Sequence, residues 1–119
     1  MPDLTRRDVI VVLATAEQAR LSGVDLSGLD LNGLNFAGAN LIKANLSKAN
    51  LTGAYMRAAE LEGANLEGAN LAHANLKEAN LKGCLMKGAN LEGANLKDAN
   101  LFAADITSDQ KARAKGIGA

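Results

Sequence analysis

Apolar residues recur every five positions along most of the chain. Seventeen consecutive units run from Val24 to Ser108, and the central residue of the unit is Leu in thirteen of them. The residue two positions earlier is Ala in thirteen units, and the residue between these two is Asn in eleven and Asp in three. The three remaining units carry Tyr55, Glu60 and Leu85 there. A repeat this regular predicts one architecture for the whole segment.

A period of five fits neither a helix nor a continuous strand. Five steps of about 100° turn each Leu by about 140° around a helix. An odd period also sends successive Leu residues to opposite faces of a strand. Within one unit, however, Ala and Leu share a face if the chain is locally extended, and the two remaining residues must turn it. The sequence therefore predicts short extended pieces joined by turns, coiled into a solenoid filled with Leu and Ala.

The second turn position of the repeat is rich in glycine. Ten of the twelve glycines occupy it, and glycine tolerates the positive φ that turns often need. Larger polar and charged residues occupy the same position in other units, namely Lys43, Lys48, His73, Glu78 and Asp98. We therefore expect that positive φ is not required at this position in every unit.

The A-(N/D)-L-x-x pattern resembles the repeat of the pentapeptide repeat family, and the resemblance covers the units from Val24 to Ser108. It implies an all-β solenoid, namely a right-handed quadrilateral parallel β-helix with one pentad on each side and about four coils. Residues twenty apart would then stack on one side of the shaft. On this basis residues 21–108 are assigned to the solenoid.

Residues 1–20 precede the repeat and are expected to form an N-terminal capping helix. Thr5-Arg6-Arg7-Asp8 resembles a capping box with Asp in place of Glu. A helix from Thr5 to Arg20 would cover the first coil with one face, composed of Val9, Val12, Leu13 and Ala16.

A second side of this helix would also be apolar, because it carries Ile10, Val11 and Ala14. These three residues are the candidate contact for a protein partner or for a second copy of the chain. The simpler interpretation is a capping helix with some exposed aliphatic residues. An edge strand is a further alternative, because β-branched residues favour strands.

Residues 109–119 are expected to form a short C-terminal helix or tail. Thr107-Ser108-Asp109 can begin a helix that runs to Lys115 and stops at Gly116. The basic residues near its carboxyl end suit the helix dipole, and a basic tail for an anionic partner is the alternative. A cover at each end suits a solenoid, whose core is otherwise exposed there.

Charge and composition narrow the functional classes. The chain has thirteen basic and thirteen acidic residues, so no net field attracts nucleic acid or an anionic membrane. The longest apolar run, residues 9–14, is too short to span a bilayer, and no small-residue cleavage site follows it. A lone cysteine cannot form an internal disulfide. We therefore expect a cytoplasmic protein without a membrane partner.

Stacking of residues twenty apart would align Arg57, Lys77 and Lys97 in one basic column on a side of the shaft. We interpret this basic column as solvent-exposed side chains whose positive charge is balanced by neighbouring acidic residues. Phosphate or nucleic-acid binding is the alternative. His73 occupies an outward turn position and Cys84 an inward Ala position, so the two do not form a nucleophile pair. No zinc site or phosphate-binding loop is recognisable. The sequence thus indicates no catalytic residue, cofactor or metal.

The recurring Asn residues have two interpretations. They either bond backbone groups of the turns, which is preferred, or form a lattice for ice or sugar. Some members of the pentapeptide repeat family imitate DNA and bind gyrase. Residues 24–108 carry nine acidic and seven basic side chains and no inserted loop, which argues against that role here. The sequence favours a non-enzymatic structural or protein-interaction module with an unidentified partner, and gyrase binding is the disfavoured alternative.

Overall fold

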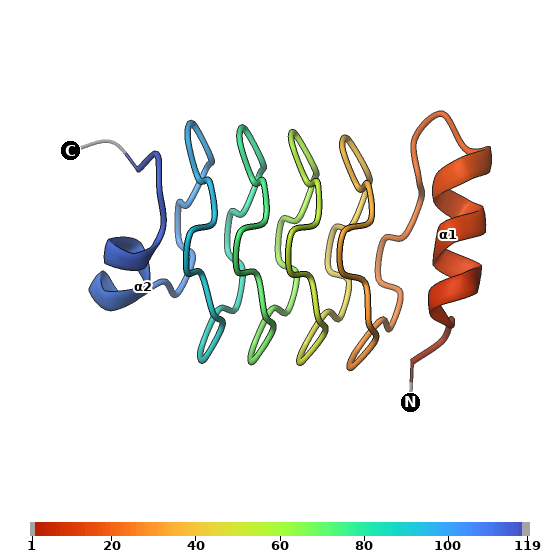
Figure 1. Ribbon diagram of the computed structural model, residues 1–119, viewed down its shortest axis with the longest axis horizontal. Helices are drawn as coiled ribbons and strands as arrows, with labels where there is room; N and C mark the ends of the chain where they lie inside the picture. The colour runs from red at the N-terminus through yellow and green to blue at the C-terminus, as the bar shows by residue number, and fades with distance from the viewer. Residues whose placement is uncertain (1, 118–119) are drawn as a thin grey trace.

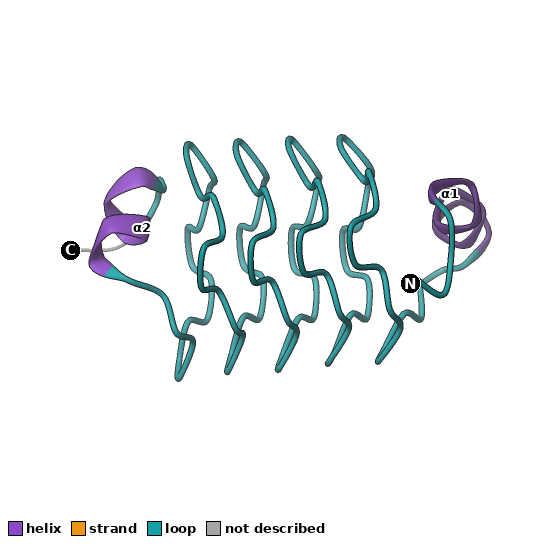
Figure 2. Cartoon of the chain, turned by 90° about the horizontal axis from the view of Figure 1, so that it is seen from below, coloured by secondary structure: helices purple, strands orange, loops and turns teal. Residues whose placement is uncertain are grey.

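Two short helices lie at opposite ends of a stack of coils (Figure 1). The computed structural model describes residues 2–117. Helix α1 spans Arg6–Thr15 and helix α2 spans Ser108–Arg113. Between the helices the chain turns repeatedly around one axis, and Figure 2 shows that this shaft consists of loops and turns.

Successive coils are joined by isolated parallel β-bridges. Every bridge pairs residues twenty apart, from Arg20 with Asn40 to Asn95 with Lys115, so four pentads complete one turn of the chain. The expected all-β description needs one correction, because residues 2–117 contain no continuous strand. Each extended piece is too short for one, since a turn interrupts it after three residues.

A complete pentad satisfies all five of its backbone N–H groups, as residues 70–74 show. In residues 70–74, three N–H groups donate to backbone carbonyls of adjacent coils, and a fourth closes the turn. The fifth, that of Ala72, donates to Oδ1 of Asn70 at 3.0 Å. The same side-chain bond recurs in most pentads, because an Asn or Asp oxygen reaches the N–H two residues later. The preferred interpretation of the Asn residues as turn-bonding groups is confirmed.

The second turn residue has a positive φ throughout the shaft, which corrects the expectation that some units avoid it. From Gly23 to Ala103 every residue at this position has a φ between 58 and 75°. Lys43 and His73 adopt this conformation at a cost of about 1 kcal/mol each. The bonds of each pentad to both neighbouring coils hold the turn in one shape, so the side chain does not change it.

The interior of the shaft is a narrow column of Leu and Ala. The central residues from Leu26 to Leu96 are each at most 2% exposed. Phe36, Met56 and Met86 fill the same central position and are also buried. The Ala positions from Ala39 to Ala94 line the same interior, and Cys84 takes one of them. The inward and outward assignment made from the sequence is therefore confirmed for this segment.

The N-terminal helix is shorter than expected. Its capping box is confirmed, because Asp8 N–H donates to Thr5 Oγ1 at 3.2 Å and Thr5 N–H donates to Asp8 Oδ2 at 2.9 Å. These bonds with Thr5 also lower the pKa of the Asp8 carboxyl. The helix ends at Thr15, however, and not at Arg20.

The solenoid begins one pentad before the unit that starts at Val24. Ala19 and Leu21 are buried, and Arg20 forms a bridge with Asn40. The boundary at residues 20 and 21 therefore lies inside a pentad. Arg20 hid this unit in the sequence because it stands where the repeat has Asn. Ala16, expected on the inner face of the helix, is an exposed C-cap.

The C-terminal helix also differs from its expected extent. Helix α2 starts at Ser108 and ends at Arg113, and it does not reach Lys115. The chain then returns to the path of the coils, because Lys115 N–H donates to Ala94 O and Lys115 O accepts from Leu96 N–H, both at 2.7 Å. Pairing with the shaft competes with helix continuation here, and it ends the helix.

Candidate interaction surface at the N-terminal helix

Helix α1 packs on the shaft through one apolar side. Val9 is fully buried, and Val12 and Leu13 are half-buried against the core. Burying these side chains provides the attraction that holds so short a helix in place, because a helix of ten residues is marginal by itself in water. The predicted inner face is confirmed for these three residues.

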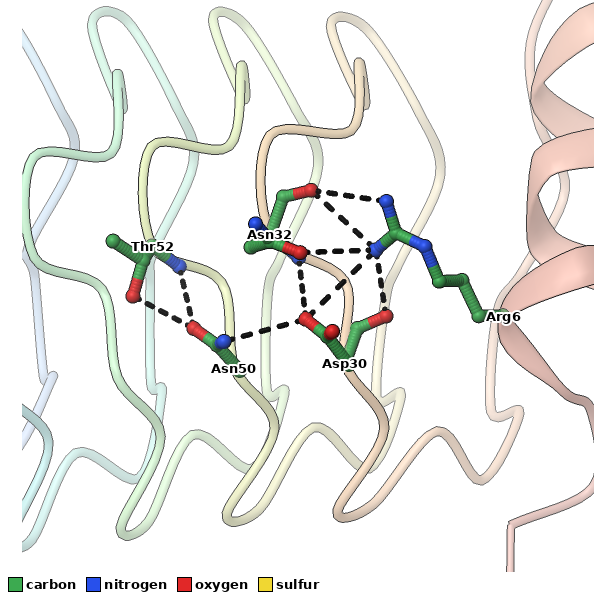
Figure 3. Close-up of polar contacts among 5 residues, drawn as sticks. All are labelled: Arg6, Asp30, Asn32, Asn50 and Thr52. Carbon is green, nitrogen blue, oxygen red and sulfur yellow. Dashed lines mark hydrogen bonds and ion pairs between the residues drawn. The ribbon is translucent and has the colours of Figure 1, made fainter.

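Arg6 provides a polar contact that fixes where α1 sits (Figure 3). Its Nη1 donates to Asp30 O at 2.8 Å and to Asn32 Oδ1 at 3.2 Å, and it lies 3.8 Å from Asp30 Oδ1. Asp30 is itself bonded to the next coil, since Asn50 Nδ2 donates to Asp30 Oδ1 at 3.3 Å. The sequence offered no signal for this role, because it did not show which coil residue lies below the helix.

Two further contacts tie the segments around α1 to the first coil. Asp3 N–H donates to Asp25 O at 2.7 Å, and Asp25 N–H donates to Asp3 Oδ2 at 2.8 Å. After the helix, Gln18 Nε2 donates to Gly38 O at 3.0 Å. The helix is therefore held at both ends, and its orientation on the shaft is well defined.

The opposite side of α1 faces away from the coils. Ile10 is 43% exposed and Val11 55% exposed, and Ala14 is exposed as well. The structure thus places the three candidate contact residues together on one free side of the helix. Exposed aliphatic side chains in a group are a feature of interaction surfaces.

A groove of about 520 Å³ runs between the carboxyl end of α1 and the first coil. It is lined by Val12, Ala16, Glu17, Gln18 and Arg20. Val12 and Ala16 form the aliphatic part of this lining, and Glu17 and Arg20 add one acidic and one basic side chain. The groove therefore offers both apolar and charged groups next to α1.

The positive charge of the basic column is partly neutralised by an acidic side chain. Backbone bonds between adjacent coils place Arg57, Lys77 and Lys97 one above another. Arg57 Nη2 lies 3.0 Å from Glu78 Oε1, and its Nε donates to the same oxygen at 3.2 Å. This pairing supports the interpretation of the basic column as solvent-exposed, charge-balanced side chains, and it argues against a phosphate site.

The reactive side chains do not form a catalytic site. Cys84 is buried and its thiol donates to Leu61 O at 2.9 Å, and burial raises the pKa of the thiol to about 12. His73 lies on an exposed turn. Within residues 2–117 no three His, Cys, Asp or Glu residues gather closely enough to hold a metal ion. No helix in this part of the chain is long and apolar enough to cross a membrane.

Leu85 breaks the repeat at an outward position. It stands where Asn normally accepts a hydrogen bond from the N–H two residues later, so it offers Lys87 no acceptor, and it is 44% exposed. We expect Leu85→Asn to raise the free energy of unfolding by about 0.5–1.5 kcal/mol, the value of one such bond. Chemical denaturation measures this change. Leu85→Ala is the control, because it removes the same exposed leucine without adding an acceptor, and an equal effect of both variants would contradict the prediction.

Comparison with known proteins supports the repeat architecture. The family described as Pentapeptide repeats matches the chain in eight copies, over residues 19–57, 49–88 and 84–108. No curated protein sequence shows significant similarity to the chain.

The solved structures similar to this chain include two cyanobacterial pentapeptide repeat proteins. HetL, from the cyanobacterium Nostoc sp. strain PCC 7120, is 39% identical with a TM-score of 0.71, and the match covers 75% of this chain and 41% of HetL. HetL is described as a pentapeptide repeat protein involved in heterocyst differentiation regulation. Rfr23, from the cyanobacterium Cyanothece 51142, is 38% identical with a TM-score of 0.57, over 77% of this chain and 59% of Rfr23. This chain therefore spans about two fifths of the first protein and three fifths of the second.

The repeats matched by the family fill most of the chain, from residue 19 to residue 108, and their bridges follow the twenty-residue period of a four-sided coil. The chain therefore belongs to the pentapeptide repeat family, whose members fold as right-handed quadrilateral β-helices.

Proposed function

We propose that this chain is a non-enzymatic protein-interaction module that contacts its partner through the outward side of α1. The shaft, of about four coils, acts as a rigid support, and α1 and α2 close its two ends. The observation that carries this proposal is the contrast within one helix, where Val9 is fully buried while Ile10 and Val11 are about half exposed. Contact with the shaft explains the burial of Val9, and contact with a partner would explain the aliphatic side chains on the exposed side.

The chemistry of the chain agrees with binding better than with catalysis. Pentapeptide repeat proteins are in general structural or interaction modules. The buried thiol of Cys84, with its raised pKa, is protonated near neutral pH and is a poor nucleophile. A DNA-like surface is a poorer fit, because the shaft alternates acidic and basic side chains and pairs Arg57 with Glu78 and Lys82 with Glu62.

Affinity capture from the cells that produce the protein tests this proposal. Wild-type chain is compared with the Ile10→Glu and Val11→Glu variants, which place a charge on the contact side. We expect both variants to lose proteins that the wild type retains, because a buried unpaired carboxylate opposes binding. Quantitative mass spectrometry of the captured fractions measures the loss.

Leu85→Glu is the matched control for this capture. Leu85 is 44% exposed, close to the value of Ile10, but it lies on the shaft and not on α1. This variant should retain the same proteins as the wild type. Identical captured fractions from all four proteins would show that the outward side of α1 is not a contact surface.

A further inference from the structure

We propose that the partner of α1 is the α1 helix of a second copy of this chain, packed antiparallel to it across a two-fold axis. This inference rests on the proposed function and names its partner. The argument starts from a stripe on the outward side of the helix. Arg7, Val11 and Ala14 follow each other at spacings of four and three, beside Ile10, and all four residues are exposed. Such spacings place side chains on one side of a helix.

The two ends of this stripe have opposite electrostatic character. Arg7 lies in the first turn of α1, is exposed, and takes part in none of the salt bridges within residues 2–117. The last turn of α1 contains no basic residue, so the negative end of the helix dipole has no cation of its own there. The exposed Glu17 follows two residues after the helix and adds a negative charge at the same end.

These charges match only when the two helices are antiparallel. In that arrangement Arg7 of each copy reaches the carboxyl end of the other α1 and its Glu17. A parallel arrangement would instead place Arg7 against Arg7. The surface is thus complementary to itself under a two-fold rotation, which is the requirement for a closed dimer.

The apolar part of the stripe fits the same arrangement. Pairing Arg7 with Glu17 places the two-fold axis at the level of residue 12, next to Val11. Ile10 of one copy would then lie near Ala14 of the other, so that a larger side chain meets a small one twice. The outward side of α1 is at the end of the shaft, and the coils lie behind the helix (Figure 1). Two shafts would therefore approach end to end without collision of their coils.

The size of the contact sets its strength. A helix of ten residues is about 15 Å long, so a pair of such helices buries less area than a standard stable interface. We therefore expect a weak, reversible dimer that forms between about 10 µM and about 1 mM chain, as for interfaces below about 1,200 Å².

Sedimentation equilibrium of the full chain tests the pairing by exchange of charges. Wild type is compared with Arg7→Glu, with Glu17→Arg and with the variant that carries both substitutions. Each single substitution should weaken the dimer about tenfold, because two-fold symmetry makes it reverse two contacts at once. The double variant should restore the dissociation constant to within about threefold of wild type, because it re-forms both pairs with the charges exchanged.

Loss of folding stability is not expected to explain weaker dimerisation of these variants. Glu at the first turn of α1 and Arg after its last turn both suit the helix dipole, so each single variant should keep or slightly raise the melting temperature. Lys97→Glu on the shaft is the control for a change of net charge, and it should dimerise as the wild type does.

The outcomes separate this inference from the proposed function. A wild-type chain that stays monomeric throughout this concentration range overturns the self-pairing, and capture of another protein that depends on Val11 would still support the proposed function. Single variants that weaken the dimer without rescue by the double variant overturn the antiparallel arrangement. A dimer that is unaffected by Val11→Glu would place the contact outside α1 and overturn the pairing of α1 with itself.

Discussion

Replacing Leu71 by Asn should lower the free energy of unfolding by about 3–8 kcal/mol. Leu71 occupies the central position of its pentad and is fully buried. The substitution removes most of the apolar contact of the side chain, which by itself costs about 2–5 kcal/mol in protein cores. It also places an amide in a column of Leu and Ala that offers no free hydrogen-bonding group, which adds about 1–3 kcal/mol. Chemical denaturation followed by circular dichroism measures the change.

The adjacent residue supplies the matched control. Asn70→Leu exchanges the same two residue types at an outward position, where Asn70 Oδ1 accepts from Ala72 N–H at 3.0 Å and from Asn90 Nδ2 at 3.3 Å. Its loss should cost only about 1 kcal/mol, because the exposed N–H can bond to water instead. Equal losses of stability in the two variants would contradict the inward and outward assignment of the repeat.

Replacing Val9 by Asp should detach α1 from the shaft. Val9 is fully buried, so a carboxylate there would be separated from water without a partner. We expect a loss of about 2–4 kcal/mol, limited by release of the helix, which exposes the first coil instead. The released helix should also be cut faster by trypsin at Arg6 and Arg7, so proteolysis reports the detachment directly.

Val11→Asp is the control for this prediction. Val11 is 55% exposed, and the same substitution there should change the stability of the monomer by no more than about 0.5 kcal/mol. Trypsin should cut this variant at the wild-type rate. If both variants release α1, the helix does not sit on the shaft through the side that contains Val9.

The shaft could be predicted from the sequence because its information is local. Most pentads carry their own buried Leu and Ala and their own turn residues, so the same local pattern predicts the same conformation in all seventeen units. The role of Asn could be predicted for the same reason, because Asn70 bonds an N–H only two residues away. Local chemistry did not show that the turn requires a positive φ at Lys43 and His73. This conformation is imposed by bonds to the adjacent coils, and not by the residue itself.

The candidate surface was predictable only in part. The helical period indicated that Ile10, Val11 and Ala14 share a side, and the structure places them on the exposed side of α1. The contacts that orient the helix were not predictable, because Arg6 reaches residues 24 and 26 positions away. The repeat gives the spacing of such residues along the shaft, but it contains no information on the direction in which a terminal helix crosses the coil.

By itself, the sequence determined the period, the composition of the core and the family to which the chain belongs, because each follows from residues within a few positions of one another. The tertiary structure decided where the helices stop, since pairing of Arg20 with Asn40 and of Lys115 with Asn95 competes with the helical bonds. It also decided which side of α1 remains free, because burial of Val9 and the bonds of Arg6 to Asp30 and Asn32 hold the helix in one orientation. These contacts join segments far apart in the chain, and their geometry exists only once the coils have stacked.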